Sequence, residues 1–216
     1  MRVPPDEVAA LTEIEVRAPV GPELAAAGPV LAAAFVDDPV WTAVGPRRRG
    51  HRTVTNRAVF WGIVRAAVKH GARVRVALDP DSGAVAGATI AYEPGAWPMP
   101  DSSFAWELGW AIIAGPLPLY RGLRDDRAMR EQHVDYPHMY LWFVGVDPSL
   151  HGTGVGRVLM AELHEHSDDL RAPTYLETGT GSNVGFYESL GYSVLGEIAM
   201  PSGAHMWRMQ RPAQGG

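Results

Sequence analysis

The 216-residue sequence contains no cysteine. This absence excludes disulfide bonds, a thiolate nucleophile and every metal site that uses cysteine ligands. The sequence also lacks an apolar run long enough to span a bilayer, and residues 1–22 lack the apolar core of a signal peptide. We therefore expect a cytoplasmic protein with no membrane partner.

The sequence also has no excess of positive charge, since its formal net charge is −5. Nucleic acid is therefore not expected as a partner. The one basic run, residues 47–52, is short and is interpreted as a solvated loop. His164 and His166 lie two apart on a predicted helix, where side chains point to different faces, so we predict no metal site and solvated histidines.

With 46% hydrophobic residues, the chain can form an adequate core as one domain over residues 1–216. Hydrophobic periodicity and turn residues predict an α/β fold, with a helical insertion at about residues 93–138. The expected helices are residues 22–35, 54–70, 104–113, 119–133, 154–167 and 183–190. The expected strands are residues 14–20, 73–77, 84–92, 139–146, 174–177, 192–200 and 205–210. Apolar side chains at 106, 108, 110, 112 and 113 could form a homodimer face or part of the core.

The most informative segment, residues 140–163, runs from a strand through Gly152, Gly154 and Gly156 into an amphipathic helix. Glycines allow a tight turn whose N–H groups, together with the positive end of the helix, hold an anion. The spacing does not fit a P-loop, and it departs from the dinucleotide fingerprint by placing Arg157 at the third glycine position. Glu177 could still act as the ribose-binding acid of a dinucleotide unit, which leaves a nucleotide-dependent oxidoreductase as an alternative.

A second motif, LETGTGSNVGFYESLGY, places Asn183 and Tyr187 four residues apart on one helix face. This motif, the VDP of residues 146–148, the glycine turn and the AAAFVDDP of residues 32–39 resemble the GNAT superfamily of N-acetyltransferases. The resemblance covers most of the chain and is closest in appearance to puromycin N-acetyltransferase-like members. His151 stands where the superfamily pattern has Arg or Gln, but a cradle of backbone N–H groups does not depend on that side chain.

The resemblance implies a GNAT-type mixed, mostly antiparallel central sheet with splayed central strands and flanking helices. It implies direct transfer of an acetyl group from acetyl-CoA to a primary amine of a small molecule. A peptide or protein amine is the nearest alternative acceptor. From a different class, the same fold could serve as a non-catalytic acyl-CoA-binding regulatory module.

The resemblance also implies roles for individual residues. The Val146 N–H would polarise the acetyl carbonyl, and Tyr187 would be the general acid. Candidates for the base are Glu107, Asp135, His138 and Glu177, of which Glu177 is favoured by its place at the end of a cleft strand. Asn183 would contact the pantetheine or cap its own helix. Asp38 and Trp41, with Asp37, would line the acceptor pocket. The expected cofactor-binding residues are Phe143, Val144, Val146, His151, Gly152, Thr153, Gly154, Val155, Gly156, Arg157, Asn183 and Tyr187.

Overall fold

A seven-stranded sheet forms the centre of the computed structural model, which describes residues 14–97 and 113–215. The strand order is β1-β2-β3-β4-β5-β7-β6, and every neighbouring pair is antiparallel except the parallel pair β4–β5. This arrangement confirms the predicted fold class. The strands are β1 Val16–Arg17, β2 Arg73–Leu78, β3 Val85–Tyr92, β4 Met139–Val146, β5 Thr174–Thr178, β6 Ser193–Ala199 and β7 His205–Arg211.

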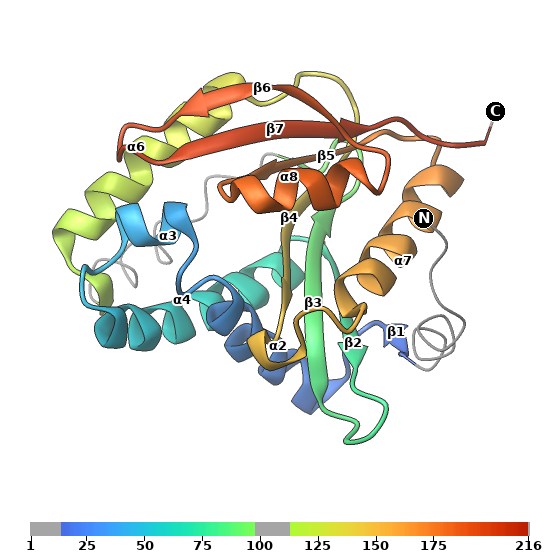
Figure 1. Ribbon diagram of the computed structural model, residues 1–216, viewed down its shortest axis with the longest axis horizontal. Coiled ribbons are helices and arrows are strands. Elements are labelled where there is room, and N and C mark those ends of the chain that lie inside the picture. The colour runs from blue at the N-terminus through green and yellow to red at the C-terminus, as the bar shows by residue number, and fades with distance from the viewer. Residues whose placement is uncertain (1–13, 98–112, 216) are drawn as a thin grey trace.

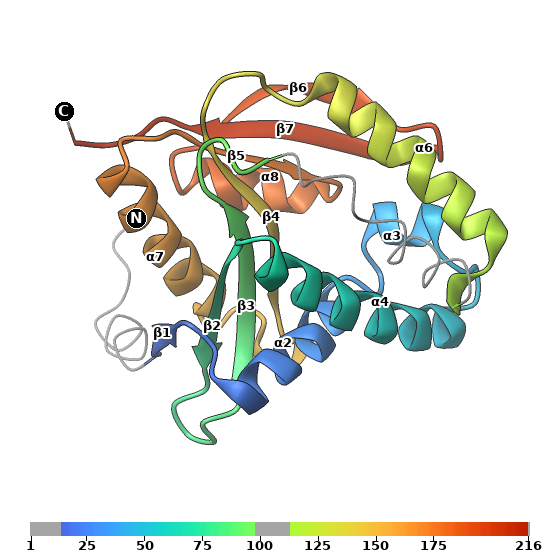
Figure 2. The same ribbon diagram turned by 180° about the vertical axis from the view of Figure 1, so that it is seen from behind.

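Helices cover both faces of this sheet (Figures 1 and 2). Helices α2 and α4 lie together on one face and bury the main apolar cluster, which includes Leu31, Phe60 and Ile90. Helices α7 and α8 lie on the opposite face, while α3 and α6 contact each other beside the sheet. The helices are α2 Gly21–Ala34, α3 Pro39–Val44, α4 Arg49–Lys69, α6 Pro116–Gln132, α7 Val155–Asp169 and α8 Gly181–Glu188, with a 3₁₀ turn at Pro148–Leu150.

Two expectations at the N-terminal side are corrected. The strand expected at residues 14–20 is only two residues long, because Pro19 has no N–H to donate and α2 begins two residues later. The sequence predicts no helix between residues 35 and 54, whereas Asp38 caps the start of helix α3. The helix expected at residues 104–113 lies outside the described residues, except for Ile113. The same holds for Glu107 and for the apolar side chains at 106, 108, 110 and 112.

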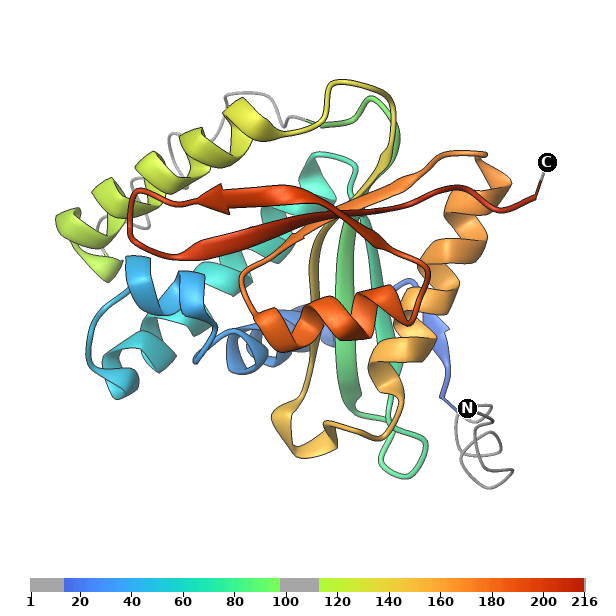
Figure 3. The same ribbon diagram turned by 45° about the horizontal axis from the view of Figure 1, so that its top comes forward.

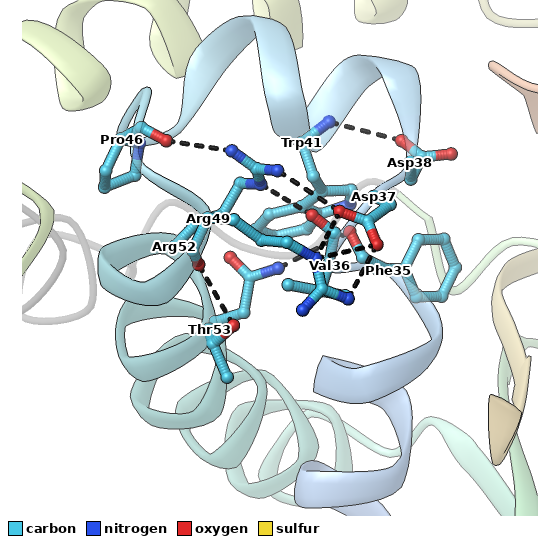
Figure 4. A network of polar contacts seen from close by, with 10 residues as sticks. Phe35, Val36, Asp37, Asp38, Trp41, Pro46, Arg49, Arg52 and Thr53 are labelled. Atoms are coloured by element: carbon cyan, nitrogen blue, oxygen red, sulfur yellow. Dashed lines mark hydrogen bonds and ion pairs between the residues drawn. The ribbon is translucent and has the colours of Figure 1, made fainter. Parts of the chain in front are cut away.

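The basic run at residues 47–52 is not a solvated loop, because α4 begins at Arg49 and Arg52 is buried. The Arg52 Nε donates to Val36 O at 2.6 Å, and its Nη1 donates to Pro46 O at 3.1 Å (Figure 4). Asp37 accepts from both Arg49 and Arg52. The guanidinium of Arg52 therefore satisfies carbonyls of the α2–α3 and α3–α4 connections and holds α3 in place.

Strands β4 and β5 separate after a short paired region. Their register runs only from Met139 opposite Thr174 to Leu141 opposite Leu176, although β4 continues to Val146. At the same point β4 contains a bulge, since Ile90 pairs with Phe143 and Ala91 with Leu141, which leaves Trp142 as the extra residue. The predicted splaying of the two central strands is confirmed, and Figure 3 shows β4 and β5 diverging.

His164 is buried rather than solvated. Its Nε2 lies 3.0 Å from the Tyr192 hydroxyl, and the residue is 9% exposed. Burial, with a smaller contribution from the charge of Arg211, lowers the pKa of His164 to about 4. The imidazole is therefore neutral in the folded protein at pH values where the unfolded chain already binds a proton.

This difference predicts an acid-sensitive fold. Between the unfolded pKa near 6.5 and the folded value of about 4, the unfolded state binds more protons, so stability falls as pH falls through this window, by up to about 3 kcal/mol. We expect urea unfolding of His164→Gln to depend less on pH from 7 to 4 than that of the wild type. His51→Gln, at an exposed histidine, is the control. Equal pH dependence in wild type and His164→Gln would contradict this assignment.

Candidate active site

A cavity of about 270 Å³ lies where β4 and β5 separate, and helices α3, α6 and α8 contribute to its wall. Its apolar lining includes several aromatic residues, among them Phe35, Trp41, Trp97, Trp142 and Phe143. Four carboxylates also line it, from Asp38, Asp125, Asp126 and Glu177. Arg130 is the one basic residue among the described lining residues, and its Nε pairs with Asp126 at 2.7 Å. The cavity therefore favours a cationic, partly apolar molecule.

The backbone of β4 offers free hydrogen-bonding groups to this cavity. The Asp147 N–H donates to Ala86 O at 2.8 Å, so the N–H and C=O groups of residues 145 and 147 point toward β3. Because these groups alternate in direction along an antiparallel strand, those of Val144 and Val146 point toward β5. β5 pairs with β4 only as far as Leu141. An extended ligand can therefore pair with Val144 and Val146 as an added strand.

The glycine turn leaves several amides available at the N-terminus of α7. Gly152 and Gly154 have φ values of 82° and 90°, which side chains disfavour. The N–H groups of Gly152, Gly154, Val155 and Gly156 donate to no other group in the described parts of the chain. The exposed residues His151 and Thr153 flank them, and Thr153 Oγ1 donates to Leu150 O. Free amides at a helix N-terminus are suited to bind phosphate oxygens.

Helix α8 presents Tyr187 and Asn183 to the same cavity. Burial, and to a smaller degree the charge of Asp38, raise the pKa of the Tyr187 hydroxyl, which therefore remains a proton donor at neutral pH. Asn183 is exposed and lies inside the first turn, because the helix begins at Gly181; the expectation that it caps its own helix is wrong. The Arg157 guanidinium, 3.2 Å from Ser189 Oγ, links α7 to α8.

Asp38 lies in the cavity wall, but its oxygens are already engaged. One oxygen accepts from the N–H groups of Val40 and Trp41 and so caps α3. The other accepts from the Thr180 hydroxyl at 3.2 Å. Burial raises the pKa of Asp38. We conclude that Asp38 connects α3 to the start of α8. Trp41 also lines the cavity, and its ring packs on that of Phe60 with centroids 4.7 Å apart. Asp37 is turned away toward Arg49.

Glu177 is the terminal member of a chain of polar contacts with His133 and His138, and the sequence indicated only part of it. Its Oε1 lies 3.3 Å from His133 Nδ1, and His133 Nε2 lies 3.1 Å from His138 Nε2. His138 Nδ1 lies 2.7 Å from the Tyr136 carbonyl, which can only accept. His133 belongs to no recognisable sequence motif. Only its position at the end of the predicted helix 119–133 could have indicated it. Asp135 is exposed and is not among the cavity-lining residues.

This order of donors and acceptors leaves the chain short of one proton. The Tyr136 carbonyl requires a proton on His138 Nδ1, so a neutral His138 presents Nε2 as an acceptor. His133 must then donate through Nε2, and its Nδ1 faces the Glu177 carboxylate, which also accepts. Uptake of one proton converts this contact between two acceptors into a hydrogen bond. Glu177 lines the cavity, so a proton could enter this chain of contacts from a group bound there.

Asp125 is a second residue that the sequence did not reveal. It lies on α6, is 3% exposed, and its Oδ1 accepts from the Ser202 N–H at 2.9 Å. Its Oδ2 has no hydrogen-bond partner.

Within the two described ranges, no cluster of three His, Asp or Glu side chains has the arrangement of a metal site. Over those same ranges, no helix is both long and apolar enough to cross a membrane.

Residues 119–192 match the family model of the Acetyltransferase (GNAT) family. The matched segment contains most of α6, β4, the glycine turn, α7, β5 and α8, which together hold most of the site described above. The match agrees with the GNAT resemblance of the motifs that lie within residues 119–192.

Solved structures share the fold at low identity. A protein of Corynebacterium glutamicum described as histone acetyltransferase HPA2 and related acetyltransferase is 22% identical, with TM-score 0.72 over 94% of this chain and 98% of that one. A mosquito arylalkylamine N-acetyltransferase like 5b is 17% identical, with TM-score 0.56 and coverages of 92% and 99%. The ribosomal-protein-S18-alanine N-acetyltransferase of Escherichia coli is 14% identical, with TM-score 0.52 and coverages of 94% and 96%. These likenesses concern the fold, and the proteins themselves differ in what their names say they acetylate.

Proposed function

We propose that this chain is an acetyltransferase, as the GNAT family model matched by residues 119–192 suggests, and that it transfers the acetyl group of acetyl-CoA to a primary amine of a small molecule. One observation carries this proposal: the unpaired backbone of Val144 and Val146, the buried hydroxyl of Tyr187 and the Glu177 carboxylate lie around the space that opens between β4 and β5. The cavity volume, its aromatic lining and its excess of carboxylates support a small cationic acceptor.

The residues fit acetyl-CoA as the donor. The free amides from Gly152 to Gly156 would hold its pyrophosphate, and Val144 and Val146 would pair with the amides of its pantetheine arm. Asn183 of α8 would lie beside the pantetheine arm. So would Arg157 of α7, whose guanidinium contacts Ser189 at the end of α8. Bound there, acetyl-CoA supplies a thioester carbonyl that an amine can attack directly, without a covalent enzyme intermediate. The absence of cysteine is consistent with this direct route.

In the proposed mechanism, Glu177 accepts a proton from the substrate ammonium. His133 and His138 hold the Glu177 side chain in position. The neutral amine nitrogen then forms a bond to the thioester carbon, while the Val146 N–H donates to the oxygen that gains negative charge. Tyr187 donates its hydroxyl proton to the departing sulfur and regains a proton as the amide nitrogen loses one. The reaction converts an ammonium and a thioester into an amide, a thiol and one released proton.

The glycine turn yields a prediction for donor binding. Gly154→Ala places a side chain at φ 90° and disturbs amides that would donate to phosphate. Since hydrogen bonds to charged groups contribute about 1.5–3 kcal/mol, we expect the Kd for acetyl-CoA to rise at least about 10-fold by calorimetry. Gly83→Ala is the matched control, because it has φ 68°, open surroundings and a place in the β2–β3 turn. An unchanged Kd in Gly154→Ala would show that the turn does not bind the donor.

The proposed function is tested by calorimetry with acetyl-CoA, with NADH and ATP as comparison ligands. CoA release is then measured across a panel of small amines and N-terminal peptides. We expect acetyl-CoA alone to bind, and small amines to be acetylated with higher kcat/KM than peptides. Acetyl-CoA binding without release of CoA would favour a non-catalytic acyl-CoA-binding module. Faster turnover of peptides would overturn the small-molecule acceptor.

A further inference from the structure

We propose that Asp125 forms a second binding subsite in the cavity, which takes a cationic group of the acceptor other than the amine that is acetylated. The acceptor class is therefore a diamine, with two nitrogens joined by an apolar spacer. This inference rests on the proposed function, because it concerns the acceptor of the same cavity.

The first argument is the state of the Asp125 carboxylate. The residue is almost fully buried, and only its Oδ1 has a partner, the Ser202 N–H at 2.9 Å. Its Oδ2 is buried without any hydrogen-bond partner, although Asp125 lines the cavity. Burying a carboxylate oxygen without a donor is unfavourable, so a donor that enters from the cavity would gain a strong, charge-assisted contact.

The second argument is that the other lining carboxylates already have partners. Asp38 accepts from two backbone N–H groups and the Thr180 hydroxyl. Asp126 pairs with Arg130, whose guanidinium also lies over the Trp97 ring. Glu177 contacts His133. Among the described lining carboxylates, Asp125 is thus the one with an oxygen that is both buried and without a hydrogen-bond partner.

The third argument is the position of Asp125 relative to the proposed chemistry. Asp125 lies on α6 one turn before Met129, which shares an apolar cluster with Val40 of α3 and Met206 of the β6–β7 hairpin, and all of these line the same cavity. Val144 and Tyr187 line it from β4 and α8. An acceptor held at Asp125 through one nitrogen therefore needs an apolar body and a second nitrogen to reach the β4 side.

The test is calorimetric titration of the full chain with diaminoalkanes of four, six and eight carbons and with the monoamines of the same lengths. We expect at least one diamine to bind about 10-fold or more tightly than its monoamine, and Asp125→Asn to remove that advantage while leaving monoamine binding unchanged. Asn keeps an oxygen for Ser202, so we expect thermal unfolding of this variant to stay at or above the wild-type temperature. Glu131→Gln removes an exposed charge from the same helix and is the control.

Equal binding of diamines and monoamines at every length would overturn the subsite. Equal weakening of both by Asp125→Asn would overturn it as well, because it would indicate a general effect of charge or packing. These titrations do not require turnover or acetyl-CoA. A protein that binds diamines through Asp125 but does not bind acetyl-CoA would contradict the proposed function and not the subsite.

Discussion

Replacing Tyr187 by Phe is expected to lower kcat roughly 100-fold or more, with the Kd for acetyl-CoA unchanged. The substitution removes only the hydroxyl, and the ring remains in the apolar cluster with Met160, Leu176 and Tyr192. Because burial raises the pKa of this hydroxyl, it stays protonated across the neutral range and can supply a proton to the departing sulfur. The measurement is steady-state release of CoA with a saturating small amine, beside calorimetry with acetyl-CoA.

Tyr192→Phe is the control for this experiment. Tyr192 lies next to Tyr187, with ring centroids 5.6 Å apart, but its hydroxyl contacts His164 and it is not among the cavity-lining residues. We expect this variant to lose some stability and to keep its kcat. Wild-type kcat in Tyr187→Phe would reject the acid role and leave Tyr187 as a packing residue. Loss of kcat in both variants would indicate a general disturbance of α8.

Replacing Glu177 by Gln is expected to lower kcat by a similar factor, roughly 100-fold, because the substituted amide cannot accept a proton from the amine. The fold should be retained, since the Gln Nε2 group can donate to His133 Nδ1 in place of the contact now made at 3.3 Å. The Kd for acetyl-CoA should not change, because the Glu177 side chain contributes to acceptor chemistry in this mechanism.

The pH profile separates this base role from a purely structural one. A base that must be deprotonated before it acts gives a kcat that rises with pH, and we expect this rise in the wild type but not in Glu177→Gln. Glu197→Gln is the control, since Glu197 contacts His205 at 3.5 Å on the β6–β7 hairpin, away from the cavity lining. A Glu177→Gln enzyme with wild-type kcat and an unchanged pH profile would eliminate Glu177 as the base.

The bounds of β4 and the position of the glycine turn were predicted closely from the sequence. The strand was expected at residues 139–146, and β4 spans Met139–Val146. The helix expected from residue 154 begins at Val155, directly after Gly154 in a left-handed conformation. These features depend on local backbone preferences, such as the positive φ that glycine allows, and local preferences are encoded by neighbouring residues. The residues proposed to bind the donor could therefore be predicted without the tertiary structure.

Side-chain partners were predicted less well. Arg52 was interpreted as solvated, yet packing of α4 against the α2–α3 connection buries its guanidinium among carbonyls. Asp38 was expected to line the acceptor pocket and does line the cavity, but it also accepts from Thr180, which is 142 residues away in the chain. In both cases a charged residue has a structural partner that no pattern in the nearby sequence indicates.

The sequence by itself determined the approximate bounds of β2 to β7, the glycine turn and the motif with Asn183 and Tyr187, because each follows from spacing within a short segment. Only the tertiary structure decided that Glu177 meets His133 across 44 residues, and that Asp125 meets Ser202 across 77 while its other oxygen stays unpaired. The physical reason is that a buried side chain takes its hydrogen-bond partners from whichever elements pack against it, and packing brings together residues that lie far apart in the chain.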